Sequence, residues 1–432
     1  MANKEIYVSL DIGTSCIRVV VGEMANQSLN VLSVGEAASY GLKKGAIVDI
    51  DATVKGIQSA VEQAERSCGF AIERVIVGVN GHHVDLQPSH GVVAVSSENR
   101  EITNEDIDRV IDAAQVVSIP PEREIVDVVP NQFVVDGLDE ITDPRGMIGV
   151  RLEMDGTIIT ASKTLLHNLL RCVERAGLEV SDIGLQPLAA GMIAASKDER
   201  SLGVALVDIG GGATTLSVFK HGRLQNVSVL PVGGENISND ISVGFRTSTE
   251  EAEKVKREHG HAFIDDASDD VSFSIPVIGS DSEETYTQYE LAHIIEPRME
   301  EIFEMVAEEM VRLGYNDLPG GFVLTGGTVM MPGALELARD VLNIGVRVAV
   351  PDHIGVRSPQ YTNTIGLIEF AHRNVKIQGK DVGAAVAPLE EEAPHRKQQQ
   401  SSTEETASAS EKGGNEKGLG KRMKNIFRVF FE

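Results

Sequence analysis

The sequence contains no tryptophan, only 4% aromatic residues, and three cysteines in 432 residues. Three scattered cysteines form neither a disulfide framework nor a CxxC metal motif. They fit a reduced compartment, where cysteine serves as a small buried apolar residue. No run of about 18 apolar residues is present, which argues against a membrane-spanning helix. The first residues also lack the apolar core of a signal peptide. We therefore expect a cytoplasmic protein.

Positive charge is scarce as well. The chain has 39 Lys and Arg against 65 Asp and Glu, so its formal net charge is −26. An acidic surface repels phosphate backbones, which excludes nucleic acid as the main partner. The 42% hydrophobic and 24% charged residues are typical of a globular protein. The length indicates roughly two to four domains.

An internal repeat is present. Residues 8–22 read VSLDIGTSCIRVVVG, and residues 205–219 read ALVDIGGGATTLSVF. A further match at nearly the same offset relates residues 31–36 to residues 229–235. Each copy predicts a strand, a turn rich in glycine and hydroxyl residues, a second strand, a polar turn and a third strand. Because repeats of this kind mark a duplicated unit, the sequence predicts a molecule built from two related halves.

The rest of the chain divides by pattern and composition. Residues 84–160 do not fit the repeat and predict an inserted unit with strands and a helix. Residues 389–418 are rich in Gln, Ser, Glu and Gly with no aromatic residue, which indicates a disordered linker. The predicted organisation is a first half at 1–83, an inserted subdomain at 84–160, the completion of the first half with a connecting helix at 161–200, a second half at 201–377 with a smaller subdomain at about 245–313, a linker at 378–416 and a terminal helix at 417–432.

Two predicted helices carry signals at specific residues. Residues 51–68 have helical spacing, with Asp51 as a plausible N-cap. Residues 289–313 also have helical spacing, but Pro297 is expected either to kink this helix or to mark its true start.

The paired glycine turns carry the chemistry. Asp11 and Asp208 each stand at the end of a predicted buried strand, just before the turn. Backbone N–H groups of such turns approach phosphate oxygens closely, and the aspartates suit the water shell of a Mg²⁺ ion that bridges the phosphates. A tight turn needs glycine in any case, but the duplicated pair favours a nucleotide in a cleft between the halves. The turn at residues 324–328, Leu-Thr-Gly-Gly-Thr, is weak evidence by itself.

These motifs stand in a recognisable order: Asp-Ile-Gly-Thr, then Gly-Leu-Gln-Pro-Leu-Ala-Ala at residues 184–190, then Asp-Ile-Gly-Gly-Gly-Ala-Thr-Thr and Leu-Thr-Gly-Gly. The order resembles the actin-like ATPase superfamily, which includes actin, the seventy-kilodalton chaperones and sugar kinases. Over nearly its full length the chain resembles the FtsA family of bacterial cell-division proteins. The resemblance implies an α/β fold of duplicated actin-like (ribonuclease-H-like) halves, a nucleotide cleft between them and an inserted α+β subdomain.

The resemblance also implies a site for ATP and Mg²⁺. The residues that match the two phosphate loops are Asp11, Gly13, Thr14, Ser15 and Arg18 in the first and Asp208, Gly210, Gly211, Gly212 and Thr214 in the second. The residues that match contacts to phosphate, ribose and adenine are Gly234, Glu253, Lys256, Gly326 and Gly327. Asp11 and Asp208 would hold Mg²⁺ through water. A solvated helix face is the alternative for Glu253 and Lys256, which form ordinary helical charge pairs.

Gln186 falls where the superfamily places a water-orienting side chain. A neutral amide positions water but is a poor base, so we expect at most a slow Mg-dependent ATPase. Metal chemistry of other kinds is not indicated. His82 and His83 are adjacent on a predicted strand and would point to opposite faces, and no cluster of His, Cys, Asp and Glu has metal-ligand spacing.

The terminal segment 417–432 predicts an amphipathic helix. Its apolar stripe consists of Leu419, Met423, Ile426, Phe427 and Phe430, and its basic side carries Lys421, Lys424 and Arg428. A basic helix on a linker from an acidic body is typical of an interfacial anchor for anionic lipid. The alternatives are a helix that docks back on the core and a helix that binds a calmodulin-like partner.

In the family, the protein tethers the tubulin-like protein FtsZ to the inner face of the cell membrane at the division septum. The resemblance places the FtsZ C-terminal peptide on the helix that contains Arg298 and Glu301, which lie three residues apart on one face. Charges that merely face water are the alternative. It also implies self-polymerisation and later division proteins as partners. Functional alternatives are an actin-like pilus-assembly or plasmid-partition ATPase and a sugar- or acetate-type kinase.

Overall fold

The computed structural model describes residues 5–25, 28–279, 282–378, 382–383 and 386–388. The predicted linker from residue 389 onward and the predicted terminal helix at 417–432 lie outside the described residues. No helix in the described part of the chain is long and apolar enough to cross a membrane.

The first half contains a five-stranded sheet. Its strands, in spatial order, are β12 (Glu179–Leu185), β7 (Arg74–Val79), β1 (Glu5–Ile12), β2 (Cys16–Ala25) and β3 (Ser28–Ala38). β1, β2 and β3 pair antiparallel, whereas β7 and β12 run parallel to β1. Helices α1 (Ile50–Cys68) and α3 (Lys163–Arg175) cover one face and form an apolar core with it. β1, β2 and β7 are buried over most of their length, because both faces of the sheet are covered there.

The second half repeats this sheet. The order is β15 (Arg223–Leu230), β14 (Thr214–Lys220), β13 (Val204–Ile209), β18 (Phe322–Thr325) and β19 (Val346–Val348). The directions match as well, since β13, β14 and β15 are antiparallel and β18 and β19 are parallel to β13. This identity of order and direction confirms the duplication predicted from the sequence repeat.

Two helices join the halves. α4 (Gln186–Ala194) follows β12 of the first half but contacts β13 and β14 of the second. α10 (Thr362–Gln378) follows β19 of the second half but packs on β1, β2, β7 and β12 of the first. The helices also contact each other closely, because a Cβ at Gly366 would lie 2.5 Å from the Ala189 carbonyl oxygen. The apolar core between the halves is therefore built by exchanged helices.

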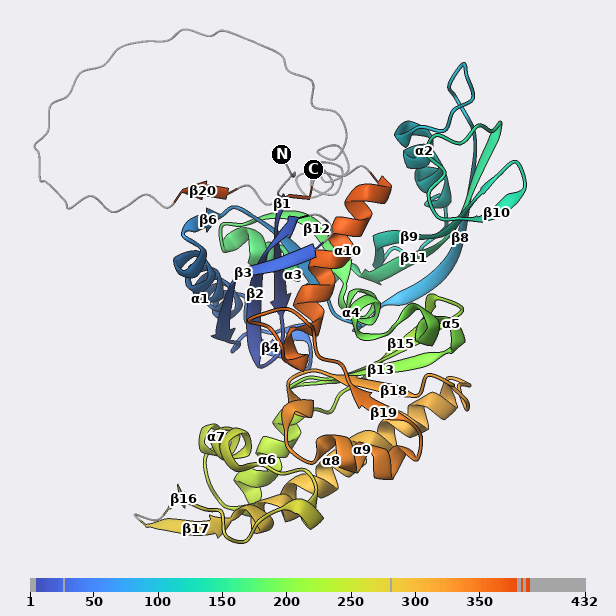
Figure 1. The fold of residues 1–432 in the computed structure, drawn as a ribbon. Coiled ribbons are helices and arrows are strands. Elements are labelled where there is room, and N and C mark those ends of the chain that lie inside the picture. Colours follow the sequence, from blue (N-terminus) through green and yellow to red (C-terminus); the bar gives the residue numbers. More distant parts are fainter. Residues whose placement is uncertain (1–4, 26–27, 280–281, 379–381, 384–385, 389–432) are drawn as a thin grey trace, which may run out of the picture.

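An inserted subdomain lies between β7 and β12 in the chain. Its antiparallel sheet has the order β10 (Leu138–Ile141), β9 (Arg123–Val135), β11 (Arg151–Ser162) and β8 (Asp85–Ala94), and α2 (Asn104–Ala114) packs against it. The unit has its own small apolar core. Figure 1 shows it projecting to one side of the first half, away from the lower part of the second half.

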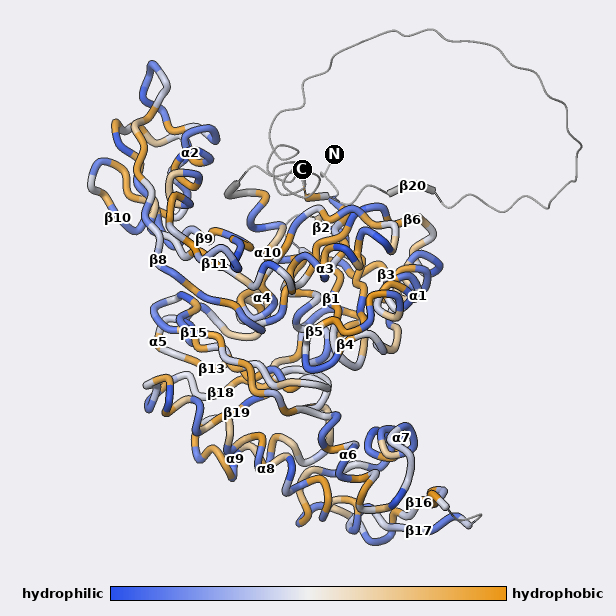
Figure 2. Tube along the Cα trace, turned by 180° about the vertical axis from the view of Figure 1, so that it is seen from behind, coloured by the Kyte–Doolittle hydropathy of each residue, from blue (hydrophilic) through white to orange (hydrophobic). Residues whose placement is uncertain are grey.

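The second half has its own excursion after β15. It consists of α6 (Gly234–Gly244), α7 (Thr249–His259), the hairpin β16 (Ser272–Pro276) and β17 (Glu283–Thr287), and α8 (Gln288–Arg312). α9 (Ala334–Leu342) and α8 share a core with the second sheet. Figure 2 shows that hydrophobic residues follow the strands of both central sheets, whereas α7 is largely hydrophilic.

Smaller elements complete the described chain. The short hairpin of β4 (Leu42–Lys43) and β5 (Ala46–Ile47) follows β3, and α5 (Lys197–Leu202) follows α4. β20 (Val386–Pro388) pairs antiparallel with β6 (Phe70–Ile72) beside α1.

Two details of the helix predictions are corrected. The N-cap of α1 is Asp49, whose Oδ1 accepts the Ala52 N–H at 3.0 Å. Asp51 lies in the first turn and pairs with Arg175. α8 begins at Gln288, after the cap residue Thr287, so Pro297 lies inside the helix and does not mark its start; the alternative of a kink at Pro297 stays a prediction. The buried side chains on both sides of the proline hold the helix against the sheet and compensate for the missing N–H.

Candidate functional site

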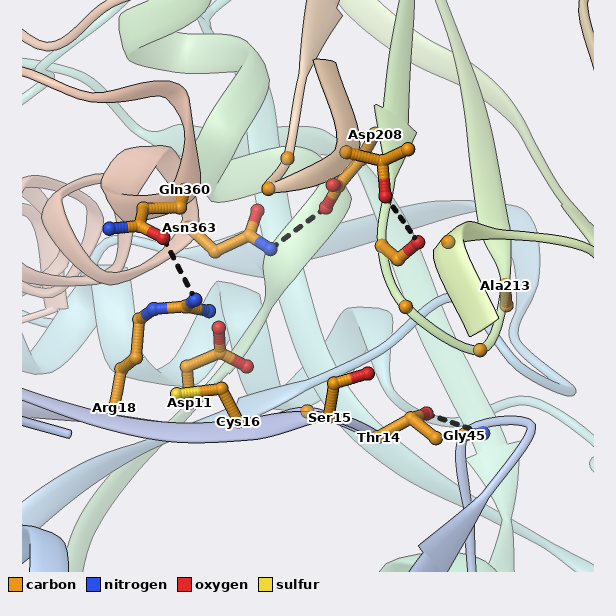
Figure 3. A pocket seen from close by; sticks show the side chains of 18 of the residues that line it. Asp11, Thr14, Ser15, Cys16, Arg18, Gly45, Asp208, Ala213, Gln360 and Asn363 are labelled. Atoms are coloured by element: carbon orange, nitrogen blue, oxygen red, sulfur yellow. Dashed lines mark hydrogen bonds between the residues drawn. The ribbon is translucent and has the colours of Figure 1, made fainter. Parts of the chain in front are cut away.

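A cavity of about 650 Å³ lies between the two halves. All of the predicted nucleotide residues line it except Thr214. Thr214 is fully buried, and its hydroxyl donates to the Val232 carbonyl oxygen at 2.8 Å, while its neighbours Ala213 and Thr215 face the cavity. The structure thus brings together residues that are about 200 to 300 positions apart in the sequence. Figure 3 shows the two aspartates and the loops that follow them converging on this space.

Asp11 and Asp208 are each held by an amide at the start of a helix. Gln186 Nε2 donates to Asp11 Oδ1 at 2.5 Å, and Asn363 Nδ2 donates to Asp208 Oδ2 at 2.9 Å. Gln186 is the first residue of α4, and Asn363 is the second residue of α10. Each half therefore supplies a carboxylate and the amide that orients it.

The environment of the two aspartates disfavours their charge. Burial raises the pKa of Asp11 to about 6; Arg18 opposes this shift and Asp208 adds to it. Burial also raises the pKa of Asp208, against the hydrogen bond from Asn363 and the charge of Arg18. Two buried carboxylates with raised pKa values are stabilised in their charged form by a cation. The pair therefore fits a hydrated divalent ion, with oxygen ligands of the type that Mg²⁺ prefers.

Arg18 brings positive charge to the same cavity. Its Nε donates to Glu36 Oε1 at 2.8 Å, and its Nη2 donates to Gln360 Oε1 at 3.1 Å. Although burial opposes the charged form, neighbouring Cys16, Asp11 and Glu36 raise the pKa of Arg18 above its ordinary value. A fixed guanidinium beside the glycine loops suits a phosphate group.

The two glycine loops touch each other across the cleft. A Cβ at Gly211 would lie 1.7 Å from Ser15 Oγ, and a Cβ at Gly212 would lie 2.7 Å from Thr14 Cγ2. A side chain at either glycine would therefore have to displace Ser15 or Thr14 of the opposite loop. Ser15 Oγ also donates to Glu235 Oε1 at 2.9 Å, from the first half to the start of α6 in the second.

Lys256 closes another part of the cavity wall. Its Nζ donates to the Gly234 carbonyl oxygen at 2.8 Å, to Ser238 Oγ at 2.7 Å and to Glu253 Oε2 at 2.5 Å. The Lys256 side chain is only 9% exposed, so a solvated helix face does not describe it. Burial lowers the pKa of Lys256, whereas the adjacent Lys256 charge holds the pKa of Glu253 below its ordinary value despite burial. Buried Lys256 and half-buried Glu253 thus form a polar cluster at the cavity.

The third glycine turn completes the wall. Gly326 has φ +95°, and a Cβ there would lie 2.4 Å from Asp208 Oδ1, so this position needs glycine. A Cβ at Gly327 would meet no atom within 4 Å, so this position leaves open space in the cavity. Thr328 Oγ1 donates to the Gly210 carbonyl oxygen at 3.0 Å and ties this turn to the second phosphate loop.

Sequence reasoning missed several polar residues at the site: Glu36, Asn80, His82, Glu235, Gln360 and Asn363. Asn363 lies in the first turn of α10 as Gln186 lies in the first turn of α4, but the repeat is too divergent there for the sequence to reveal the equivalence. The sequence predicts that His82 and His83 lie on a strand. That prediction is wrong, because both lie in the turn between β7 and β8. Within the described ranges, no group of three or more His, Cys, Asp and Glu side chains is arranged to hold a metal ion directly.

Arg298 and Glu301 lie on α8, outside the cavity lining. Arg298 Nε and Nη2 donate to Asp240 of α6 at 2.6 and 3.1 Å, and Arg298 also hydrogen-bonds Glu301. Arg298 is therefore part of a charged network that joins α6 to α8. The apolar side of α8, including Ile295, Ile302 and Phe303, is buried in the core.

Two equivalent halves, exchanged helices and a cleft between glycine loops define an actin-like protein. Solved structures agree. The chain is similar to the PilM–PilN type IV pilus biogenesis complex, with a TM-score of 0.57, 17% identity, and coverage of 85% of this chain and 98% of that one. It is also similar to MreB5 of Spiroplasma citri bound to ADP, with a TM-score of 0.51, 14% identity, and coverage of 86% and 97%.

Sequence relatives identify the particular family. Residues 205–366 match the model of cell division protein FtsA, and residues 81–160 match the model of the SHS2 domain inserted in FtsA. The chain is 62% identical over 383 residues to cell division protein FtsA of Bacillus subtilis, covering 89% of this chain and 87% of that protein. It is 32% identical to FtsA of Escherichia coli, covering 85% and 90%. The chain belongs to the FtsA family of cell-division proteins.

Proposed function

We propose that this division protein binds Mg·ATP in the cleft and tethers FtsZ filaments to the inner face of the cytoplasmic membrane at the septum. Membership of the FtsA family supports a role in division. It favours this function over the pilus-assembly, plasmid-partition and kinase alternatives, since the likeness to the pilus complex shows the fold alone.

The paired aspartates carry the nucleotide part of the proposal. Asp11 and Asp208 reach one cavity from the two halves, and burial raises the pKa of both. A hydrated Mg²⁺ ion would neutralise them and bridge the phosphates when Mg·ATP is bound. The glycine loops would offer backbone N–H groups, and Arg18 would offer a guanidinium to the phosphates. The ADP-bound state of the similar MreB5 structure supports a nucleotide in this cleft.

Hydrolysis is expected to be slow. The Gln186 amide donates to Asp11 at 2.5 Å, so its nitrogen is already used to orient a carboxylate. Its remaining oxygen can hold a water molecule but is a poor base for activating it. ATP would therefore act mainly as a ligand that holds the two halves together.

Membrane attachment is assigned to residues 417–432. The stripe of Leu, Met, Ile and Phe would enter the headgroup region, and Lys421, Lys424 and Arg428 would face anionic lipid. Burial of five large apolar side chains contributes several kcal/mol at about 25 cal/mol per Å², less the cost of ordering the helix. One such tail binds reversibly, so several tails in a homopolymer would bind far more tightly.

The FtsZ C-terminal peptide is assigned to the surface of α8 around Arg298 and Glu301. The charged network with Asp240 holds Arg298 in place, so its guanidinium is pre-organised at the surface. Self-assembly is supported by the likeness to the MamK double helical filament, with a TM-score of 0.50, 13% identity, and coverage of 85% and 98%. Later division proteins are expected as further partners.

Cosedimentation with anionic lipid vesicles tests the tether. We expect the full chain to sediment, more strongly with Mg·ATP, and a chain that ends at residue 416 to stay in solution. Phe427→Glu places a charge on the apolar stripe and should release the protein, whereas the matched Phe427→Leu should still bind. Raised salt should weaken binding only in part, because the apolar contribution is not screened.

Calorimetric titration with Mg·ATP keeps the two parts of the proposal separate. Phe427→Glu should bind Mg·ATP like the wild type. If that variant still sediments with vesicles like the wild type, the tail docks on a partner and the membrane assignment is wrong. If the wild type takes up no Mg·ATP, the cleft assignment is wrong, whatever the tail does.

A further inference from the structure

The chain stays attached to the body beyond the end of α10. Val382, four residues after Gln378, is only 1% exposed and belongs to the apolar core between the halves. Residues 386–388 then form β20, which pairs antiparallel with β6. We call these two contacts, Val382 in the core and β20 on β6, the clasp. The clasp lies within the segment that the sequence assigns to the linker, so the start of this segment is held at two places.

β6 is prepared to accept a strand on one edge. It follows α1 through Gly69, which has φ +82°, and the Ile72 side chain is buried in the core of the first half. Glu65 Oε1 of α1 accepts the Ile72 N–H at 2.6 Å and holds the other edge of β6 to the helix. Successive N–H groups along a strand point to opposite edges, so the Ala71 N–H faces β20. Among the described residues, β6 pairs with β20 alone.

The pairing has a defined register and a defined end. Ala387 lies opposite Ala71, at the middle of both strands, and Pro388 lies opposite Phe70. Proline has no backbone N–H to donate to a ladder and is found at strand ends. The sequence after Pro388 reads Leu-Glu-Glu-Glu-Ala-Pro, in which acidic residues replace the small apolar ones. The clasp therefore ends at Pro388, and the chain leaves the body from that residue.

The clasp moves this exit point across the first half. Figure 1 shows β20 beside β6 and α1, whereas the C-terminal end of α10 lies on the side of the inserted subdomain, and Figure 2 shows the same separation from behind. The 28 residues between Pro388 and residue 417 would span about 30 Å on average as a disordered linker. A folded body of about 380 residues has a radius of gyration of roughly 21 Å. Because these lengths are similar, the point of exit matters as much as the length of the linker.

We propose that the clasp determines where the membrane tether leaves the body, at the α1 side of the first half instead of the side of the inserted subdomain. Strand pairing at β6 holds the exit point, and Val382 holds the segment that leads to it. Without the clasp, the tether would begin at residue 379 beside the inserted subdomain, with 38 residues before the terminal helix. The inference rests on the proposed membrane attachment and adds the side of the body that is held toward anionic lipid.

Residue-resolved hydrogen exchange of the full chain tests the pairing. Ala387→Pro removes the N–H at the middle of β20, so the Ala71 N–H should exchange about tenfold faster than in the wild type, as expected for the loss of a backbone hydrogen bond. The Ile72 N–H is bonded to Glu65 and should be unchanged, so it is the internal reference. Ala407→Pro makes the same substitution in the predicted linker outside the clasp and is the matched control.

Energy transfer to labelled anionic vesicles tests the role of the clasp. A dye attached through Gln58→Cys on α1 or, separately, through Asp139→Cys on β10 reports how close each side lies to the lipid, in a chain whose accessible cysteines are replaced by serine. With the clasp intact, transfer should be more efficient from position 58 than from position 139. Ala387→Pro should abolish this difference, and Ala407→Pro should preserve it.

The outcomes separate the two proposals. If Ala387→Pro does not fold, Val382→Ala loosens the clasp without a proline and should change both measurements in the same directions. Unchanged exchange at Ala71 in the folded variants would overturn the clasp. Faster exchange with an unchanged difference in energy transfer would overturn its role as the exit point. If the wild type binds no vesicles, the membrane proposal fails and the assigned exit point fails with it, while exchange at Ala71 still decides the pairing.

Discussion

The two halves share one sheet but place their additions at different points. Counted along the chain, the inserted subdomain follows the fourth strand of the first sheet, β7. The excursion of α6 to α8 follows the third strand of the second sheet, β15. The order and direction of the five strands, and the place of the loop that meets the cavity, are the same in both halves. The common part therefore makes the site, whereas the additions give each half a surface of its own.

The equivalence extends to the orientation of the carboxylates. In each half, the α-helix after the fifth strand carries in its first turn an amide that donates to the aspartate of the first strand: Gln186 to Asp11 and Asn363 to Asp208. The halves differ in their cations. Arg18 of β2 lies opposite Asp11, whereas Thr215 of β14 lies opposite Asp208, and the second half brings Lys256 of α7 to the cavity instead.

The largest expected effect concerns stability and pH. The raised pKa of Asp11 means that the folded protein holds this proton more tightly than the unfolded chain does. Its contribution to stability is therefore present below about pH 4 and is lost as the pH rises through about 6. Asp11→Asn removes this pH-dependent loss of stability, because an amide at this position does not ionise. Relative to the wild type, its free energy of unfolding should rise by up to roughly 3 kcal/mol between pH 4 and pH 7.

Urea unfolding without nucleotide and with a chelator measures this difference. Asp208→Asn should shift stability in the same direction, because burial also raises the pKa of Asp208. A gain in one variant and a loss in the other at pH 7 would show that the two aspartates are not equivalent, and a loss in both would contradict the raised pKa values.

The second effect is on binding. Asp11→Asn and Asp208→Asn should each weaken Mg·ATP binding about 30-fold, or roughly 2 kcal/mol, since each removes one of two charges that face a shared ion. The double variant should lose less than the sum, because the two sites are coupled. Calorimetry measures the affinities, and Asp139→Asn on the exposed strand β10 is the control. Full affinity in either single variant, while folded, would remove that half from the metal site.

The smallest effect concerns the surface that belongs to the second half alone. Arg298→Ala should lower the affinity for an FtsZ tail peptide about tenfold while costing less than about 1 kcal/mol of stability, as expected for partly exposed ion pairs. Fluorescence titration measures the affinity. Arg109→Ala, which breaks a helical pair with Asp106 in the inserted subdomain, should leave it unchanged. Unchanged affinity in Arg298→Ala would remove this residue from the peptide site.

The sequence predicts the part of the fold that repeats, because Asp-Ile-Gly and the apolar strands around it are local patterns with a fixed offset. It also predicts the inserted unit, which breaks that repeat. It does not predict Asn363 or Asn80 at the cavity, or the bond of Glu235 to Ser15, since these contacts depend on packing between distant segments. The apolar residues before His82 predict a strand there, but β7 ends at Val79, and His82 lies in a turn where its ring contacts Gly45 of the hairpin. The N-cap of α1 lies two residues before the predicted one. Asp49 and Asp51 are both aspartates at the start of the same helical pattern, so the sequence alone does not distinguish them as caps.

The exchange of α4 and α10 has a consequence for synthesis of the chain. One face of the first sheet, formed by residues such as Tyr7, Val20 and Ile76, is covered by Leu367 and Ile368 of α10. Those residues leave the ribosome only after both sheets have been made. The first half thus carries a bare apolar face for most of translation, and its final packing waits for a helix encoded near the end of the second half. The two halves are duplicated in structure, but neither can complete its folding alone.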